Sequence, residues 1–162
     1  MARAVAAWFD SLPPAARDAP LIRRQEAHTL LLLDRPAEAR ARLRPLLAQP
    51  ITSSTMSFAL MGLAGAVAAA DGDSVEARGW MDRITTRARA LTPAARGISW
   101  GESPYWRSTI AARLGDSTLA LILLRDARRA GLGMEPSVHA EPAFVALRRW
   151  PPLAAVLAPV TR

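Results

Sequence analysis

The residues that could carry chemistry in this chain are few and widely separated. His28 and His139 are the only histidines, and cysteine is absent. Glu26 lies two positions from His28, which puts the two side chains on different faces of a helix, and His139 precedes Glu141 in an expected loop. A zinc site needs three or four ligands at compatible spacing. We therefore interpret both histidines as structural or surface residues and predict neither a metal site nor a cofactor.

Two polar clusters have simpler explanations than chemistry. Asp71-Gly72-Asp73 resembles the start of a calcium loop, but the rest of the ligand pattern is missing, and a turn followed by a helix N-cap accounts for it. Ser53-Ser54-Thr55 has no histidine nearby and fits the start of a long apolar helix. We predict no catalytic residues and a protein that is not an enzyme. A dispersed active site stays a third hypothesis, because catalytic geometry is three-dimensional.

The composition favours an all-α fold. Hydrophobic residues make up 51% of the 162 residues and aromatic residues only 6%. Ala, Leu and Arg, which are strong helix formers, dominate the sequence. No segment shows sustained alternation of apolar and polar residues, so we expect no strands. The length fits one domain.

The basic character of the chain has two interpretations. The net charge is +7, all 21 basic residues are Arg, and both Lys and Asn are absent. Both missing residues use A-rich codons, so a GC-rich genome is the simpler cause of the high pI. The alternative is a nucleic-acid-associated regulator that uses an Arg-rich surface, and its binding would depend steeply on salt.

A junction between two helices recurs three times and organises the chain. Each copy is an apolar helix, a tight polar turn and a second amphipathic helix, with the sequences LDRPAEAR, DGDSVEAR and LGDSTLAL. Aligned on Ala39, Ala77 and Ala120, the copies are 38 and 43 residues apart. The position twelve residues before each alanine also holds a small residue, as close packing of antiparallel helices requires. Periods in this range indicate stacked helical hairpins.

Local signals place the ends of the helices. Asp73 and Asp116 are predicted N-caps, and Pro36 suits a first helical turn. Pro45 is expected to kink its helix or end it early. A loop is expected over Thr92–Ser103.

These signals divide a single domain into five parts. The partial first unit (1–14) holds a lone helix over Ala2–Leu12, which suggests that the chain begins within an array. Short turns opened by prolines at the C-terminus are expected to cover the last hairpin. The parts are 1–14, the hairpins 21–50, 52–92 and 103–131, and the cap 139–160.

The three junctions, each with a small residue twelve positions earlier, resemble the tetratricopeptide repeat. The stretch from Gly115 to Pro159 is similar to the closing segment of bacterial tetratricopeptide tails, which often follow a Ser/Thr kinase, an adenylate cyclase or a transcriptional-regulator domain. The resemblance implies an α-α superhelix of about three hairpins. It also implies a scaffolding or signalling role as part of a longer protein, with a protein or peptide as the partner.

In repeats of this kind the first helices line the concave surface, as the resemblance implies. Aromatic and Arg side chains are enriched at binding hot spots, so the candidate partner-binding residues are Arg24, His28, Trp100, Tyr105, Trp106 and Arg107. Packing of the aromatic side chains between units is the competing interpretation, and the sequence favours it.

The remaining expectations concern location and assembly. The longest apolar run, about Met56 to Ala70, is too short to span a bilayer, and the N-terminus lacks a secretory pattern. We therefore expect a cytoplasmic protein. A partial first unit would leave an apolar helix face exposed, which predicts a homodimer.

Overall fold

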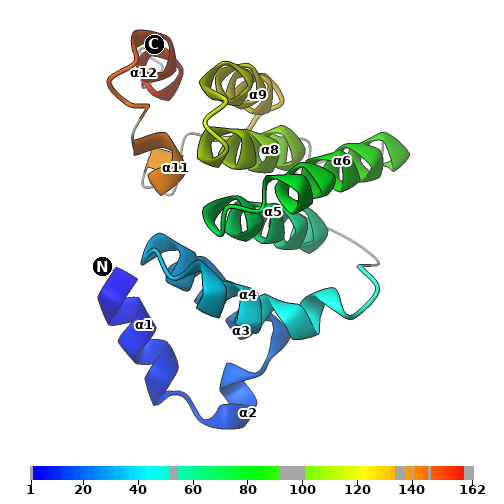
Figure 1. The fold of residues 1–162 in the computed structure, drawn as a ribbon, viewed down its shortest axis with the longest axis vertical. Coiled ribbons are helices and arrows are strands. Elements are labelled where there is room, and N and C mark those ends of the chain that lie inside the picture. Colours follow the sequence, from blue (N-terminus) through cyan, green and yellow to red (C-terminus); the bar gives the residue numbers. More distant parts are fainter. Residues whose placement is uncertain are drawn as a thin grey trace.

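The computed structural model describes residues 2–51, 55–91, 101–133, 138–139, 141–145 and 147–158, and the statements on structure refer to these residues. They form ten helices and no strand (Figure 1), so the predicted all-α class is confirmed. The helices are α1 (Ala2–Ser11), α2 (Pro14–Arg17), α3 (Pro20–Leu32), α4 (Pro36–Leu47), α5 (Thr55–Ala70), α6 (Ser74–Ala90), α8 (Glu102–Arg113), α9 (Ser117–Arg129), α11 (Pro142–Val145) and α12 (Pro151–Leu157).

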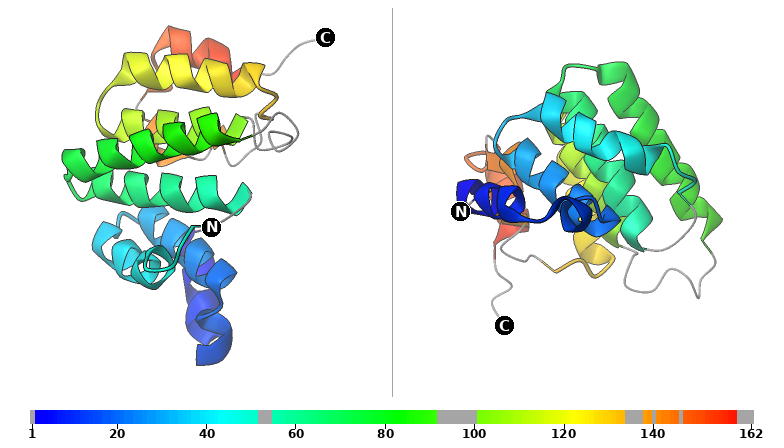
Figure 2. Two further views of the ribbon diagram at one scale, coloured as in Figure 1. Left: turned by 90° about the vertical axis from the view of Figure 1, so that its right-hand side faces the viewer. Right: turned by 90° about the horizontal axis from the view of Figure 1, so that it is seen from below.

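The longer helices pack as three consecutive pairs. α3 packs against α4, α5 against α6, and α8 against α9. The pairs are stacked (Figure 2), with α5 in contact with α4 on one side and with α8 on the other. α11 and α12 lie against the last pair. Within the described ranges, no helix is both long and apolar enough to cross a membrane.

The turns inside the three pairs share one hydrogen-bond pattern. In each turn a residue with positive φ donates its N–H to the carbonyl three residues back, and the next N–H donates to the carbonyl five residues back. These two hydrogen bonds satisfy carbonyls that the end of a helix leaves free. The positive-φ residues are Asp34 (59°), Gly72 (85°) and Gly115 (81°). The predicted junction therefore recurs as backbone geometry.

The second helix of each pair begins as its sequence predicts. The Asp73 side chain accepts a hydrogen bond of 2.8 Å from the Glu76 N–H, and the Asp116 side chain accepts one of 3.0 Å from the Leu119 N–H. Pro36 occupies the first turn of α4, where its missing N–H costs nothing. These caps set where α4, α6 and α9 start.

The aligned small residues are all buried. Ala27, Ala39, Ala77, Ser108 and Ala120 have no exposed surface, and Gly65 is buried as well. A Cβ atom added to Gly65 would lie 2.4 Å from Ile110 Cδ1 on α8 and 3.0 Å from Trp80 Cβ on α6. The absence of a side chain at Gly65 thus lets α5 approach both neighbouring helices.

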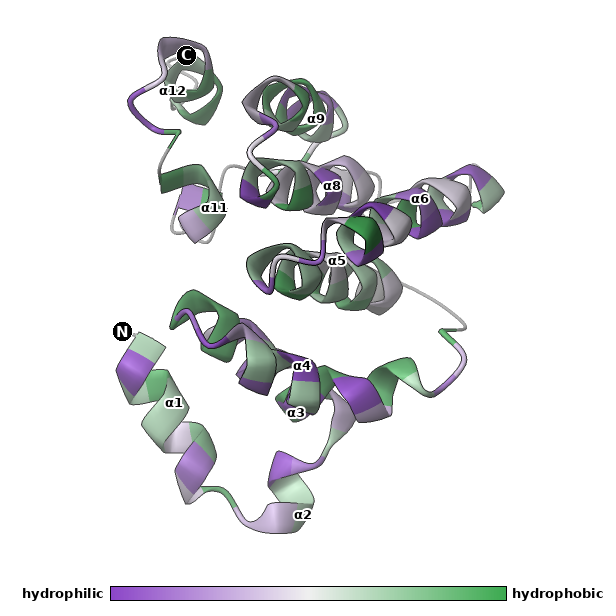
Figure 3. Cartoon of the chain, viewed as in Figure 1, coloured by the Kyte–Doolittle hydropathy of each residue, from purple (hydrophilic) through white to green (hydrophobic). Residues whose placement is uncertain are grey.

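A second glycine on α5 makes room for an aromatic ring. A Cβ atom added to Gly62 would lie 2.2 Å from Cγ of Trp106, so the Trp106 indole lies directly on the α5 backbone. Around this contact α5 is apolar on nearly every side (Figure 3). Phe58, Leu63 and Val67 on α5 are almost completely buried.

The C-terminal helices cover one side of the last helix pair, with α11 against α8 and α12 against α9. Phe144 of α11 and Leu153 of α12 are fully buried, and they form a second core cluster with Leu121 and Leu124. Arg128 donates hydrogen bonds to the carbonyls of Val156 and Ala158, which fixes the end of α12. The prolines expected to open these turns lie at or next to the helix starts.

Three details differ from the sequence predictions. α4 does not end early at Pro45 but continues to Leu47, with the Ala48 N–H still bonded to the Arg44 carbonyl. The short helix α2, opened by Pro14, was not predicted. The expected loop over Thr92–Ser103 is two residues too long at its C-terminal end, because α8 already begins at Glu102.

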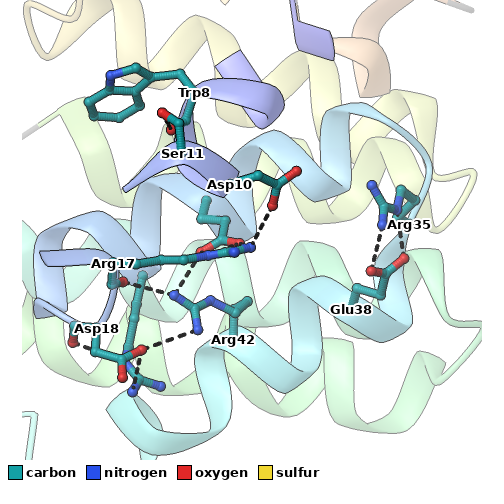
Figure 4. A network of polar contacts seen from close by, with 10 residues as sticks. Trp8, Asp10, Ser11, Arg17, Asp18, Arg35, Glu38 and Arg42 are labelled. Carbon is teal, nitrogen blue, oxygen red and sulfur yellow. Dashed lines mark hydrogen bonds and ion pairs between the residues drawn. The ribbon is translucent and has the colours of Figure 1, made fainter. Parts of the chain in front are cut away.

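The N-terminal helices are attached through a buried carboxylate. Glu26 of α3 is 4% exposed and forms ion pairs with Arg17, which also contacts Asp10, and with Arg42 at 2.7 Å. Figure 4 shows the side chains of Arg17 and Arg42 close together, with Arg17 also paired to Asp10 and Arg42 to Asp18. α1 buries Phe9 but leaves Trp8 51% exposed. α1 therefore leaves large apolar side chains exposed, and the partial first unit and the homodimer stay predictions.

Substitution of Gly62 tests the close contact between α5 and α8. We expect Gly62→Ala to lower the free energy of unfolding by about 1–3 kcal/mol, because the new methyl group displaces Trp106. Gly79→Ala is the matched control in α6, where an added Cβ meets nothing within 4 Å. It should raise stability by about 0.5–1 kcal/mol through helix propensity alone. Urea unfolding of both variants measures the difference, and equal gains in stability would contradict the close contact.

Substitution of Glu26 tests the N-terminal attachment. Glu26→Gln should cost about 2–4 kcal/mol, because it removes the buried carboxylate that Arg17 and Arg42 share and leaves each of them only a more exposed partner, Asp10 or Asp18. Glu38→Gln, which breaks the exposed pair between Glu38 and Arg35, is the control and should have a much smaller effect. Thermal unfolding followed by circular dichroism compares them. Similar melting temperatures for the two variants would show that Glu26 does not hold α1 and α2 in place.

Candidate partner-binding surface

Two helices that are distant in sequence present the candidate residues on one surface. Arg24 and His28 lie one turn apart on α3, and Glu102 and Trp106 lie one turn apart on α8. His28 and Trp106 meet edge to face, with ring centroids 6.2 Å apart at 67°. We call these four residues, together with Tyr105, the α3–α8 surface.

The aromatic residues of this surface form a continuous row. The centroid of the Tyr105 ring lies 5.3 Å from that of Trp106 and 6.4 Å from that of Phe144, and both ring pairs are arranged edge to face. Trp106 is buried, whereas Tyr105 and His28 are partly exposed. Trp106 therefore packs between units, as the sequence favoured, and only its neighbours are accessible to a partner.

A buried carboxylate at the edge of the surface was missed by the sequence analysis as a site residue. Glu141 is 3% exposed and pairs with Arg113 of α8 at 2.9 Å. Its side chain also accepts a hydrogen bond from the Ala143 N–H and thereby caps α11. The one available signal was an acidic residue directly before Pro142, which is typical of a helix start.

The electrostatics of Glu141 favour its charged form. Burial alone would raise the pKa of Glu141, but His28, Arg113 and the Ala143 N–H outweigh burial and keep this pKa below its usual range. His28 Nε2 lies 3.9 Å from Glu141 Oε2, which is too long for a hydrogen bond. Nε2 of His28 is buried and has no hydrogen-bond partner among the described residues.

Arg24 and Glu102 face each other without forming a direct ion pair. Burial lowers the pKa of Arg24 and raises that of Glu102 to about 7, and each charge only partly compensates the other. Nε of Arg24 and Oε2 of Glu102 are buried and lack hydrogen-bond partners in the described part of the chain. Such groups cost free energy until a partner satisfies them.

The structure does not bring all the predicted residues together. Arg24, His28, Tyr105 and Trp106 share the α3–α8 surface. Arg107 lies on a different side of α8, where it lines a cavity with residues of α6 and α9, and its role in partner binding stays a prediction. Trp100 lies outside the described residues.

The arrangement offers binding groups of several kinds. Arg24 offers a buried donor, Glu102 a buried acceptor and His28 a buried imidazole nitrogen, and the His28 ring packs edge to face on Trp106. Among the described residues, no three His, Cys, Asp or Glu side chains are grouped so that they could hold a metal ion.

No protein-family model matches the chain, and comparisons with curated proteins and with solved structures also give no match.

The burial of Glu102 predicts how stability changes with pH. Its pKa rises from 4.5 to about 7 on folding, so folding favours the protonated carboxyl group. The contribution of the protonated Glu102 carboxyl group to the stability of the fold is fully present below pH 4.5 and is lost as the pH rises through about 7. Glu102→Gln lacks this titration and should gain about 1 kcal/mol over the unmodified chain between pH 4.5 and 8, a value reduced for solvent screening.

Urea unfolding of both chains at several pH values measures this change. A difference in unfolding free energy that widens between pH 5 and 7 is the expected result. Parallel curves for the two chains would mean that Glu102 titrates as an ordinary exposed carboxyl group.

Proposed function

We propose that the chain is a non-catalytic interaction module that binds a peptide or partner domain through the α3–α8 surface. One observation carries the proposal. Arg24, His28 and Glu102 each hold a buried polar atom without a hydrogen-bond partner among the described residues. His28 packs edge to face on Trp106, and Arg24 and Glu102 lie one turn from His28 and Trp106 on their helices. A bound polypeptide supplies both carbonyl acceptors and N–H donors, and can therefore satisfy all three.

The energetics favour a partner at this surface. An unsatisfied buried polar group costs about 1–3 kcal/mol, and the α3–α8 surface has three of them. The partly exposed rings of His28 and Tyr105 add contact area of the type found at hot spots. The charge of Glu102 changes near neutral pH, so partner binding should be sensitive to pH in the range from 6 to 8.

The repeated helix pairs support a repeat module as the scaffold. The three identical turns and the stacking of the pairs agree with the tetratricopeptide resemblance of the sequence. Under this proposal the pairs form an α-α superhelix, and the chain acts as a scaffold or signalling module. In repeat arrays, binding surfaces form across several repeats, as the α3–α8 surface does.

The arginines give weaker support to the nucleic-acid alternative. Phosphate binding requires free cationic groups, yet many of the arginines pair with carboxylates of the chain itself. The paired residues include Arg17, Arg23, Arg35, Arg40, Arg42, Arg113 and Arg129. We therefore treat nucleic-acid binding as an outcome of the test.

The test compares a surface variant with a charge control. The chain, its Arg24→Gln/His28→Gln variant and its Arg125→Gln/Arg129→Gln variant serve as baits in a lysate of the source cells, with washes at low and high salt. Arg129 is 78% exposed and Arg125 lies on the exposed side of α9, so the control removes charge away from the surface. We expect a protein that survives the high-salt wash on the unmodified chain and the control only, with its affinity for the surface variant at least tenfold weaker.

Two outcomes would contradict the proposal. Retention of the same protein by both variants would place its binding site elsewhere. Recovery of nucleic acid alone, released by salt and reduced by the Arg125→Gln/Arg129→Gln variant, would favour the Arg-surface alternative.

A further inference from the structure

We propose that a cavity between α6, α8 and α9 binds a small organic anion, with its carboxylate or phosphate group between Arg107 and Arg89. The cavity measures about 410 Å³ and lies apart from the α3–α8 surface. Its walls include Ala88 and Arg89 of α6, Pro104 and Arg107 of α8, and Asp126 and Ala130 at the C-terminal end of α9. The proposal does not depend on the proposed function.

Arg107, like Arg24, differs from the partly buried Arg42 and Arg113 in having no ion pair with a carboxylate among the described residues. Arg113 pairs with Glu141 at 2.9 Å and Arg42 with Glu26 at 2.7 Å. Arg107 has no such ion pair among the described residues, and its buried Nε has no hydrogen-bond partner. A partly buried cation without a counter-ion is costly, so the site is prepared for an anion.

The surroundings of Arg107 increase this cost. Burial lowers the pKa of Arg107, and the next largest effect is the like charge of Arg89, which lowers it further. Asp82 and Asp126 compensate only in part. Asp126 also interacts with Arg129 at 3.4 Å, so its charge is shared with a second cation. An anion between Arg107 and Arg89 would relieve the repulsion and supply the missing partner.

The walls of the cavity indicate the rest of the ligand. Ala88, Pro104 and Ala130 offer apolar surface, and the volume lies in the lower part of the range for small-molecule sites, about 300–1,000 Å³. The Thr85 hydroxyl already donates to the Met81 carbonyl at 2.8 Å, and Arg89 and Arg107 are the cationic donors in the lining, beside the Ser103 hydroxyl. Guanidinium groups bind carboxylate and phosphate in a bidentate manner. The ligand class is therefore an anionic head group on a small apolar body.

Calorimetry and methyl NMR on the full chain test this assignment with defined probes. Benzoate and phenyl phosphate carry the required head group, and benzamide is the neutral counterpart of benzoate. We expect both anions to bind and to shift the methyl signals of Ala88 and Ala130, while benzamide binds at least tenfold more weakly. Inorganic phosphate should bind more weakly than phenyl phosphate, because it lacks the apolar body.

Variants separate the cavity from the general positive charge. Arg107→Gln should weaken the binding of both anions at least tenfold. Arg89→Gln should also weaken their binding, and because Arg89 is exposed this substitution should not disturb the fold. Arg125→Gln removes the same charge from the exposed side of α9 and should leave binding unchanged. Equal weakening by Arg125→Gln would mean non-specific attraction. Equal affinity for benzoate and benzamide, or no binding of either anion at 10 mM or above, would overturn the proposal.

Discussion

The close approach of α8 to α5 at Gly62 is the constraint on which the rest of the structure depends. Because Gly62 has no side chain, the Trp106 indole lies on the α5 backbone, and Gly65 accommodates Ile110 one turn further along. This contact sets the position of α8 relative to the first two pairs. It also brings Trp106 beside His28, although 78 residues separate them in the sequence. The candidate surface is thus a consequence of how α5 packs.

The high arginine content serves the fold as well as the surface. Arg40 of α4 pairs with Asp71 at 2.8 Å and with Glu76 at 2.6 Å, and so connects the first helix pair to the second. Pairs of this kind hold a stack of units together at positions where apolar contact ends. Among the arginines with a buried Nε that lacks a hydrogen-bond partner, Arg24 and Arg107 also form no ion pair within the described residues, and their location is more informative about binding than the net charge of the chain.

Local features could be predicted from the sequence and long-range pairings could not. The three turns, the caps Asp73 and Asp116 and the all-α class follow from residue types at short spacing. The pairing of Arg113 with Glu141 joins α8 to the residue before α11, across 28 positions with no periodic signal. Arg107 was named as a candidate because it lies on a first helix and Arg is enriched at hot spots, but a step of one residue turns a helix by about 100°, so Arg107 lies on another side of α8 than Trp106.

The central claim is that α5 packing assembles the α3–α8 surface in the free chain. Two-dimensional nuclear Overhauser spectroscopy of the unmodified chain tests it without a partner. The account predicts a cross-peak between the imidazole protons of His28 and the indole protons of Trp106, whose ring centroids are 6.2 Å apart. A folded chain without this cross-peak, in which Trp106 still contacts α5, would contradict the account, because α3 would then not reach α8.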